Sequence, residues 1–292
     1  MIRYIVPAEE DGILLRDLLQ EKFALSHRTL SALKRKENGI LLNGTRVTVR
    51  AVLRVGDHLL LSEEDDKDGT VKPVFLPLSI LYEDEDITVC NKPSGMPTHP
   101  SFRHHEDTLA NALAYRYKDK PYVFRAVNRL DRETDGVVLT ANHARAASLL
   151  SKSMQNGLFC KEYFAVVRGE APEKGVIDRP IRRIADSIIL REVADDGDAA
   201  RTFFERICTN DAFSLLRVLP ETGRTHQIRV HLSSIGFPIA GDALYGGDPS
   251  FVRTMLHAHS LRFPHPKSGE MLTVRAPFPD DFKKLFPQLS EE

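Results

Sequence analysis

One stretch decides the fold: Asn128-Arg129-Leu130-Asp131-Arg132-Glu133-Thr134-Asp135-Gly136, followed directly by Val137-Val138-Leu139-Thr140-Ala141. A dense polar turn that leads into a short run of β-branched and apolar residues is typical of a strand entering the core. Gly136 allows the backbone to change direction where the turn meets the strand. The sequence therefore predicts a polar turn that is held against buried structure.

Asp131 lies on this turn with Arg129 and Arg132 on either side and Glu133 close by. Cationic neighbours keep a carboxylate ionised, as a nucleophile or an electrostatic catalyst requires. The alternative is an exposed turn with a structural aspartate and solvated arginines, and most such clusters are solvated surface. The local chemistry alone leaves both interpretations open.

The same residues resemble a known family signature. Arg-Leu-Asp-Arg-x-Thr-x-Gly before an apolar strand is similar to the signature of the RluA-type pseudouridine synthases. The resemblance implies an enzyme that isomerises uridine to pseudouridine in RNA, with Asp131 as its essential residue. Two positions depart from the common pattern: Asn128 stands where the family commonly has His, and Asp135 where it commonly has Ser.

The composition is that of a globular protein. The chain has 292 residues, of which 42% are hydrophobic and 28% charged, and this argues against disorder. No apolar run approaches the roughly 18 residues of a membrane helix. Three distant cysteines, Cys90, Cys160 and Cys208, exclude a CxxC metal site and predict buried free thiols in a reducing compartment. We therefore expect a cytoplasmic protein without a membrane segment.

Basic residues gather near the N-terminus although the net charge is −1. Eight of them, opposed by Glu37 alone, are Lys22, Arg28, Lys34, Arg35, Lys36, Arg46, Arg50 and Arg54. Basic charge gathered in one segment of a neutral protein is typical of a site for a polyanion. A merely solvated helix face is the weaker alternative, because counter-charges are nearly absent.

The pattern around this basic segment predicts a small domain. Apolar residues at helical spacing predict a first helix, and a second is expected at 29–36. Asn43-Gly44 predicts a hairpin between strands at 40–42 and 47–49. Two short helices, Asn-Gly hairpins and a terminal Val-Gly-Asp resemble an S4-type RNA-binding domain at residues 1–62. An acidic linker is expected at 63–76.

Residues 77–292 carry two further motifs. Tyr163 lies on a predicted strand in Lys-x-Tyr-x-Ala-x-Val, where a tyrosine can stack on a base, although an ordinary half-buried tyrosine is the usual case. In the family this tyrosine packs on the flipped uracil. Arg224 lies in Thr-Gly-Arg-Thr-His-Gln, at the predicted start of a helix that Thr225 caps and that runs to Ile235. In the family this arginine pairs with the catalytic aspartate, here Asp131.

Strands and helices are predicted through the rest of this region. Helices are expected at 109–117 and 141–154, an antiparallel pair at 203–208 and 213–219, and a two-stranded excursion at 177–198 with an acidic tip at 195–198. The predicted fold class is α+β: a catalytic domain with a mixed, largely antiparallel sheet and flanking helices, preceded by the small α/β S4-like domain.

The resemblance also implies a mechanism and a partner. The reaction breaks the C1′–N1 bond, rotates the uracil and rejoins it through C5, so no cofactor or metal is needed; His257, His259 and His265 lack the carboxylate pattern of a metal site. Asp131 attacks the sugar or the base, or abstracts a proton. The target uridine is extruded from structured RNA, and Arg129 fills the vacated space.

We expect a monomer that binds ribosomal RNA in preference to transfer RNA, through Arg28, Lys34, Arg35 and Lys36. One rival is a catalytically inactive RNA-binding protein of the same fold. Another is a hydrolase or phosphotransferase that uses Asp131, but these nucleophiles favour a second aspartate two residues later, where this chain has Glu133.

Overall fold

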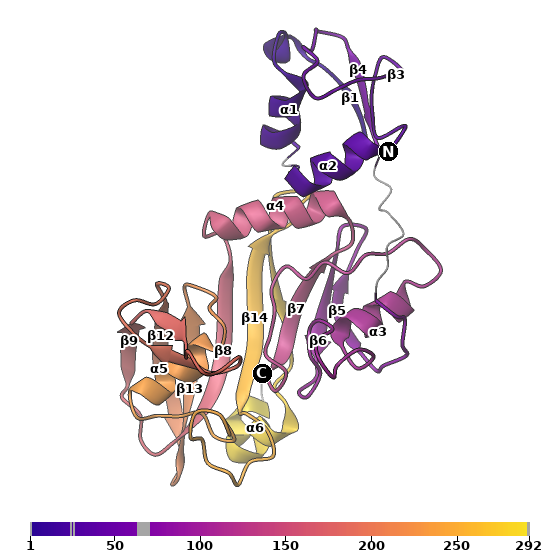
Figure 1. Ribbon diagram of the computed structural model, residues 1–292. Helices are drawn as coiled ribbons and strands as arrows, with labels where there is room; N and C mark the ends of the chain where they lie inside the picture. Colours follow the sequence, from indigo (N-terminus) through magenta and orange to yellow (C-terminus); the bar gives the residue numbers. More distant parts are fainter. Residues whose placement is uncertain (1, 24, 26, 63–70, 291–292) are drawn as a thin grey trace.

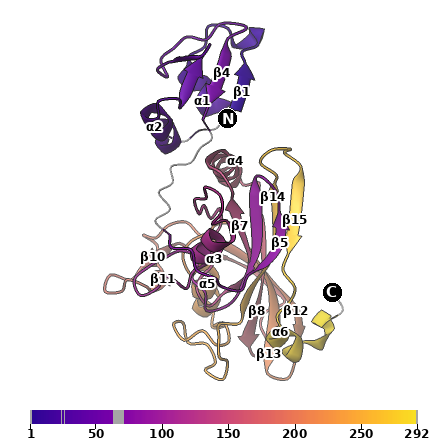
Figure 2. The ribbon, with the colours of Figure 1, turned by 90° about the vertical axis from the view of Figure 1, so that its right-hand side faces the viewer.

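A computed structural model describes residues 2–23, 25, 27–62 and 71–290, without the side chains of residues 27–29, 32 and 290. Residues 2–62 form a small unit at one end of the molecule, and the larger part of the chain is built on one long sheet (Figures 1 and 2). The small unit lies next to α4 (Ala144–Gln155), where the Arg145 guanidinium lies 5.6 Å from the ring centre of Phe23.

The small unit is a four-stranded antiparallel sheet with two α-helices and one 3-10 turn. The strands lie in the order β1 (Ile2–Ile5), β4 (His58–Leu61), β2 (Ile40–Leu42), β3 (Thr45–Arg46), and the helices are α1 (Leu15–Glu21), α2 (His27–Arg35) and the 3-10 turn η1 (Ala8–Glu10). Leu15, Leu18 and Leu19 are buried in a core made of residues from this unit. The return strand β3 begins two residues earlier than expected, directly after the left-handed Asn43 and Gly44.

A nine-stranded sheet carries the rest of the fold. Its strands follow the order β5 (Ser79–Glu83), β6 (Ile87–Lys92), β7 (Asp135–Ala141), β14 (Leu256–Pro264), β8 (Cys160–Arg168), β13 (Phe213–Pro220), β12 (Arg201–Thr209), β9 (Lys174–Asp178), with β15 (Met271–Arg275) paired to β14. Among the described strands, β7 and β14 are parallel and every other pair is antiparallel. The predicted fold class is confirmed.

Helices flank this sheet. They are α3 (Leu109–Arg116), α4, α5 (Gln227–Ser234), α6 (Asp280–Leu285) and the 3-10 turn η2 (Pro287–Ser290). Helix α3 agrees with the prediction. Helix α4 begins later than predicted, because Ala141 ends β7 and the Nδ1 of His143 caps the helix by accepting from the Ala146 N–H at 3.2 Å.

The excursion after β9 is a separate hairpin. Strand β10 (Ile181–Arg183) pairs with β11 (Arg191–Val193), so the tip is at 184–190 and the prediction of an acidic tip was wrong. The acidic residues follow β11 instead, and Asp196 forms an ion pair with Arg182 at 2.7 Å. Two backbone hydrogen bonds of 2.9 Å between Ile181 and Asp198 hold the acidic segment alongside the hairpin.

Two smaller expectations have mixed outcomes. Residues 63–70 of the predicted linker lie outside the described residues, while residues 71–76 lie against α3, where the Val74 N–H donates to Asn111 O at 3.2 Å. All three thiols are free, but only Cys90 is buried. Cys160, at the start of β8, is exposed, and Cys208 is partly buried.

Candidate active site

The turn that carries Asp131 is held by its backbone against a second loop. The Gly95 N–H donates to Arg132 O at 2.9 Å, and the Thr98 hydroxyl donates to Leu130 O at 3.0 Å. Because backbone contacts fix both sides of Asp131, the turn has a defined conformation before any ligand binds.

Lys92, at the end of β6, ties the two loops together. Its side chain is fully buried, and its ammonium donates to the carbonyls of Pro93, Met96 and Arg132 at 2.9, 2.7 and 3.1 Å. Burial lowers the pKa of Lys92 to about 8, with nearby carboxylates opposing the shift. Three carbonyls match the three N–H donors of an ammonium group. Lys92 is therefore a structural cation.

Gly136 brings the turn close to β14. Its φ is 109°, and a Cβ at this position would lie 2.2 Å from the carbonyl oxygen of Ala258. Only glycine fits this conformation and this distance. The close approach packs the start of β7, directly after the turn, against β14, whose neighbour β8 carries Tyr163.

Asp131 forms an ion pair with Arg229. Its Oδ2 lies 3.0 Å from Arg229 Nη1, and the same guanidinium makes a two-bond pair with the fully buried Asp242 at 2.7 and 2.8 Å. Burial opposes the charge of Arg229, but hydrogen bonds and charge from Asp242 and Asp131 raise its pKa. Arg229 thus stays charged and orients the Asp131 carboxylate.

The predicted pairing of Arg224 with Asp131 was wrong. Arg224 is exposed; its Nε donates to Ala199 O at 3.1 Å, and its Nη1 lies 3.8 Å from Asp198. The cause lies in the local backbone before α5, because residues 224–227 form a turn in which the Gln227 N–H donates to Arg224 O at 3.1 Å. Arg229, five residues later, reaches Asp131 instead.

The start of α5 explains why Arg229, and not Arg224, reaches Asp131. Thr225 does not cap the helix; His226 precedes it in the left-handed conformation with φ 59°, and the helix begins at the next residue. Arg229 then lies in the first turn, between the buried Ile228 and Val230. A charged residue within an apolar helical segment was the sequence signal that could have identified Arg229.

His226 is a second site residue that the sequence analysis did not assign. Its Nε2 lies 3.8 Å from Asp131 Oδ2, and its Nδ1 shares a hydrogen bond of 2.8 Å with the Tyr245 hydroxyl. Burial lowers the pKa of His226, and the Arg229 charge adds to this while Asp131 opposes it. A neutral imidazole next to the carboxylate is the expected state at neutral pH.

Tyr163 and Asp131 face the same pocket. This pocket has a volume of about 230 Å³, and its lining includes the predicted residues Arg129, Asp131, Tyr163 and Arg224, together with Met154, Lys161, Gly223, His226 and Arg229. Tyr163 is partly buried, and this burial, together with the charge of Asp131, raises the pKa of its phenol. The phenol therefore remains protonated, with its ring available for stacking.

A wider cavity of about 790 Å³ adjoins this pocket. The two share Arg129, Leu130, Asp131, His226 and Arg229 as lining residues. Arg129 is exposed and has no hydrogen bond or ion pair within the described part of the chain. Asp131 is thus accessible from a small pocket on one side and a broad groove on the other.

The two departures from the family pattern are structural in this fold. The Asn128 side chain donates to Val137 O at 3.1 Å and accepts from the Leu139 N–H at 2.7 Å, which fixes the chain before the turn to β7. Asp135 forms an ion pair with Arg253 at 3.0 Å, and hydrogen bonds and charges from His257 and Arg253 outweigh burial and lower its pKa.

The predicted phosphate-binding residues lie on and after α2. Lys34 and Arg35 are exposed, and Lys36 is partly exposed. The side chain of Arg28 lies outside the described residues. These basic residues are in the small unit and do not line the pocket at Asp131.

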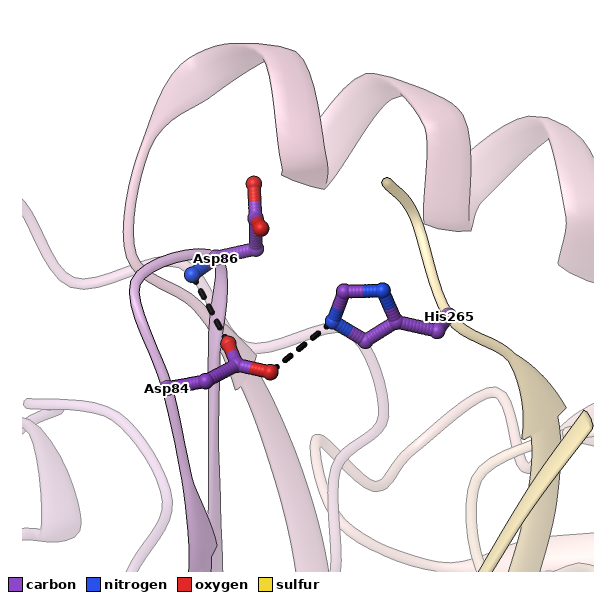
Figure 3. Close-up of side chains that lie close together, drawn as sticks. All are labelled: Asp84, Asp86 and His265. Atoms are coloured by element: carbon purple, nitrogen blue, oxygen red, sulfur yellow. Dashed lines mark hydrogen bonds and ion pairs between the residues drawn. The ribbon is translucent and has the colours of Figure 1, made fainter. Parts of the chain in front are cut away.

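One group of side chains has metal-ligand chemistry. Asp84, Asp86 and His265 have ligand atoms within 4.8 Å of one another (Figure 3). Asp84 already accepts four hydrogen bonds, from the backbone N–H groups of Asp86 and Ile87, the Tyr82 hydroxyl and His265 Nε2, at 2.8 to 2.9 Å. We interpret this group as a structural link between the β5–β6 turn and the end of β14.

A family model described as RNA pseudouridylate synthase matches residues 86–234, which include Asp131, Tyr163, Arg224 and Arg229. No helix among the described residues is long and apolar enough to cross a membrane.

Individual proteins are similar over most of the chain. The uncharacterized RNA pseudouridine synthase YjbO of Bacillus subtilis is 40% identical over 90% of this chain and 95% of its own length. The ribosomal large subunit pseudouridine synthase D of Pseudomonas aeruginosa is 34% identical over 98% and 95%, respectively. Human RNA Pseudouridylate Synthase Domain Containing 1 superposes with a TM-score of 0.60 at 28% identity, covering 70% of this chain and 84% of that one.

Proposed function

The chain belongs to the RNA pseudouridylate synthase family, and from this premise we propose that Asp131 is its catalytic carboxylate and that Tyr163 stacks on the target uracil. Family membership makes the chain an RNA pseudouridine synthase, an isomerase. The observation that carries the residue assignment is the pocket that Asp131 and Tyr163 share, with Asp131 oriented by Arg229 at 3.0 Å.

The reaction requires that the target base is unstacked from its neighbours in the RNA. The target uridine is extruded into the 230 Å³ pocket, at a cost of a few kcal/mol for unstacking. Tyr163 supports the base by stacking, and Asp131 acts at the sugar or the base. The exposed Arg129 fills the space that the uridine vacates, since it lies between the pocket and the wider groove. Arg224 lines the same pocket but does not pair with Asp131, and its role in this proposal is to contact the RNA.

The RNA that carries the target is ribosomal RNA in this proposal. Several similar proteins are named ribosomal large subunit pseudouridine synthase D, which favours the large-subunit RNA over transfer RNA. The small N-terminal unit acts as an S4-like anchor through Lys34, Arg35 and Lys36. An inactive RNA-binding protein is disfavoured, because Asp131, Tyr163 and Arg229 are all present in one pocket.

Substitution of Asp131 by Asn tests the catalytic assignment. The change removes a charge and keeps the shape, so we expect tritium release from RNA labelled at C5 of uridine to be abolished, while RNA affinity and thermal stability change little. Arg229 keeps its two-bond pair with Asp242 in this variant.

Glu133→Gln is the matched control, because it removes a carboxylate from the same turn where Glu133 pairs with Arg132. We expect this variant to turn over near the wild-type rate. Turnover of Asp131→Asn within tenfold of the wild-type rate would refute the role of Asp131.

A further inference from the structure

Lys161 places a cation in the pocket without a carboxylate partner. Its side chain is partly buried and lines the same 230 Å³ pocket as Asp131 and Tyr163. Its ammonium has one hydrogen bond, to Thr222 O at 3.3 Å, and no ion pair within the described part of the chain. Burial lowers the pKa of Lys161. The fold therefore maintains an unpaired cation in the catalytic pocket.

The contrast with Lys92 shows that this arrangement is not a structural anchor. Lys92 satisfies its three N–H donors with three carbonyls at 2.7 to 3.1 Å. Lys161 uses one donor in a long hydrogen bond, so two N–H donors remain for a ligand. Desolvating a charge without compensation is unfavourable, and such groups gather at functional sites.

The strand geometry places Lys161 beside the base site. Lys161 and Tyr163 are two residues apart on β8, so their side chains lie on one face of the strand, about 6.5–7 Å apart along it. On the other side a Cβ at Gly223 would lie 3.5 Å from the Lys161 ammonium, so the ammonium lies against the pocket wall. Lys161 and Asp131 line the same pocket, but their partners differ: Asp131 pairs with Arg229, and the Lys161 ammonium donates to Thr222 O. Lys161 therefore remains available to a base that stacks on Tyr163.

We propose that Lys161 is a further catalytic residue, which stabilises the negative charge on the uracil when its bond to the sugar breaks. This inference rests on the proposed function. When the C1′–N1 bond breaks, its electron pair leaves with the base, and the charge is delocalised over N1 and the two carbonyl oxygens. The ammonium of Lys161 donates to one of these oxygens. The base then rotates, and C5 forms the new bond to the electron-deficient C1′. The C5 proton passes to water and N1 takes up a proton, so that the product is an isomer of the substrate. No oxidant or cofactor is consumed.

The energetic role of Lys161 is greater in the transition state than in the ground state. Neutral uridine offers only a carbonyl dipole, whereas the departing base carries a full negative charge. A donor placed in advance against developing charge typically contributes a factor of about 10²–10³ in rate. Lys161 should consequently affect the chemical step more than RNA binding.

Lys161→Met is the direct test in the full-length protein. It keeps the length of the side chain and removes the charge. We expect the single-turnover rate at saturating RNA to fall about 10²-fold, with the Kd for RNA changed by less than about threefold, since phosphate contacts dominate affinity. Removing an unpaired, partly buried charge does not remove a structural ion pair, so the variant should fold. Lys174→Met, on an exposed lysine of β9, is the control that should keep the wild-type rate.

The pH profile separates a charge effect from a shape effect. The pocket also holds Tyr163 on the same strand, Arg129 and Asp131 on the turn, and Arg224, His226 and Arg229 at α5, with Cys160 next along the chain. Lys161 loses its charge as the pH rises through its lowered pKa, so wild-type activity should decline on the alkaline side below the usual lysine range near 10.4. In Lys161→Arg the cation persists to higher pH, so the decline in rate should begin at a higher pH than in the wild-type protein, and the rate should exceed that of Lys161→Met. All variants act on the same RNA, so ionisation of uridine itself affects them equally.

The outcomes distinguish this inference from the proposed function. If the wild-type protein forms pseudouridine and Lys161→Met keeps a rate within threefold of it, the inference fails alone. A rate for Lys161→Arg no higher than that of Lys161→Met would also contradict a role for the charge. If the wild-type protein forms no pseudouridine in large-subunit ribosomal RNA or transfer RNA, the proposed function fails with it.

Discussion

Arg229 serves two carboxylates with one guanidinium. It pairs with Asp242 through Nε and Nη2 and with Asp131 through Nη1, and its side chain is 6% exposed. The planar fork of arginine makes this possible, because its donors point in fixed directions. Two hydrogen bonds to Asp242 fix the orientation of the guanidinium, so Asp131 accepts a hydrogen bond from a donor in a fixed position.

Substitution of Arg229 by Ala should therefore destabilise the protein as well as inactivate it. It leaves the fully buried Asp242 without its two-bond partner, and breaking a buried ion pair typically costs about 3–5 kcal/mol. We expect that loss in the free energy of unfolding measured with urea. Arg224→Ala is the comparison, because Arg224 is exposed and should cost less than about 1 kcal/mol. Equal losses for the two variants would show that Arg229 is not the buried partner.

At the scale of elements, the sequence predicted the strands and most helices but not which arginine reaches Asp131. Strands β8, β12 and β13 and helix α3 followed from alternation and helical spacing, which are local properties. The choice between Arg224 and Arg229 depends on the left-handed His226 and on Asp242, which lies 13 residues after Arg229. A pattern of single residues does not contain that tertiary information. The start of α4 depends in part on the same kind of information, because the His143 ring that caps the helix also contacts Asp86, 57 residues earlier, at 2.9 Å.

Helix α2 is the element that should carry phosphate binding. Replacing Lys34, Arg35 and Lys36 together by Ala should reduce the slope of log affinity against log salt concentration by about two to three. Each phosphate contact that is lost means that fewer counterions are released from the RNA on binding. Binding of large-subunit RNA fragments from low to moderate salt measures this slope.

A variant with Lys174 and Lys284 replaced by Ala is the control, since both lysines are exposed and lie outside the small unit. It should keep the wild-type slope. If the variant with Lys34, Arg35 and Lys36 replaced also keeps the wild-type slope, these basic residues face solvent and do not contact RNA.

At the scale of the whole molecule, RNA anchoring and catalysis should be separable. Residues 2–62 have a core of their own, and the residues around Asp131 come from residue 127 onward in the lining of the pocket. Removing residues 1–62 should weaken RNA binding and blur the choice of uridine, while the single-turnover rate at saturating RNA changes by less than about threefold. Mapping of pseudouridines in ribosomal RNA treated with each form measures both effects. A collapse of the saturating rate in a folded truncated protein would mean that the small unit completes the catalytic pocket.

The place of β14 in the sheet also determines when the enzyme becomes active during its synthesis. Residues 256–264 lie between β7 and β8, two strands that leave the ribosome much earlier. Translation at about 5–20 residues per second separates the end of β7 from the end of β14 by roughly 6–25 s. During that interval the nascent chain has two strand edges without their final partner, and such edges favour pairing with other chains. We expect the growing chain to aggregate most readily in that interval. We also expect the complete pocket to form only after translation of β14, which supplies Leu256 to its lining.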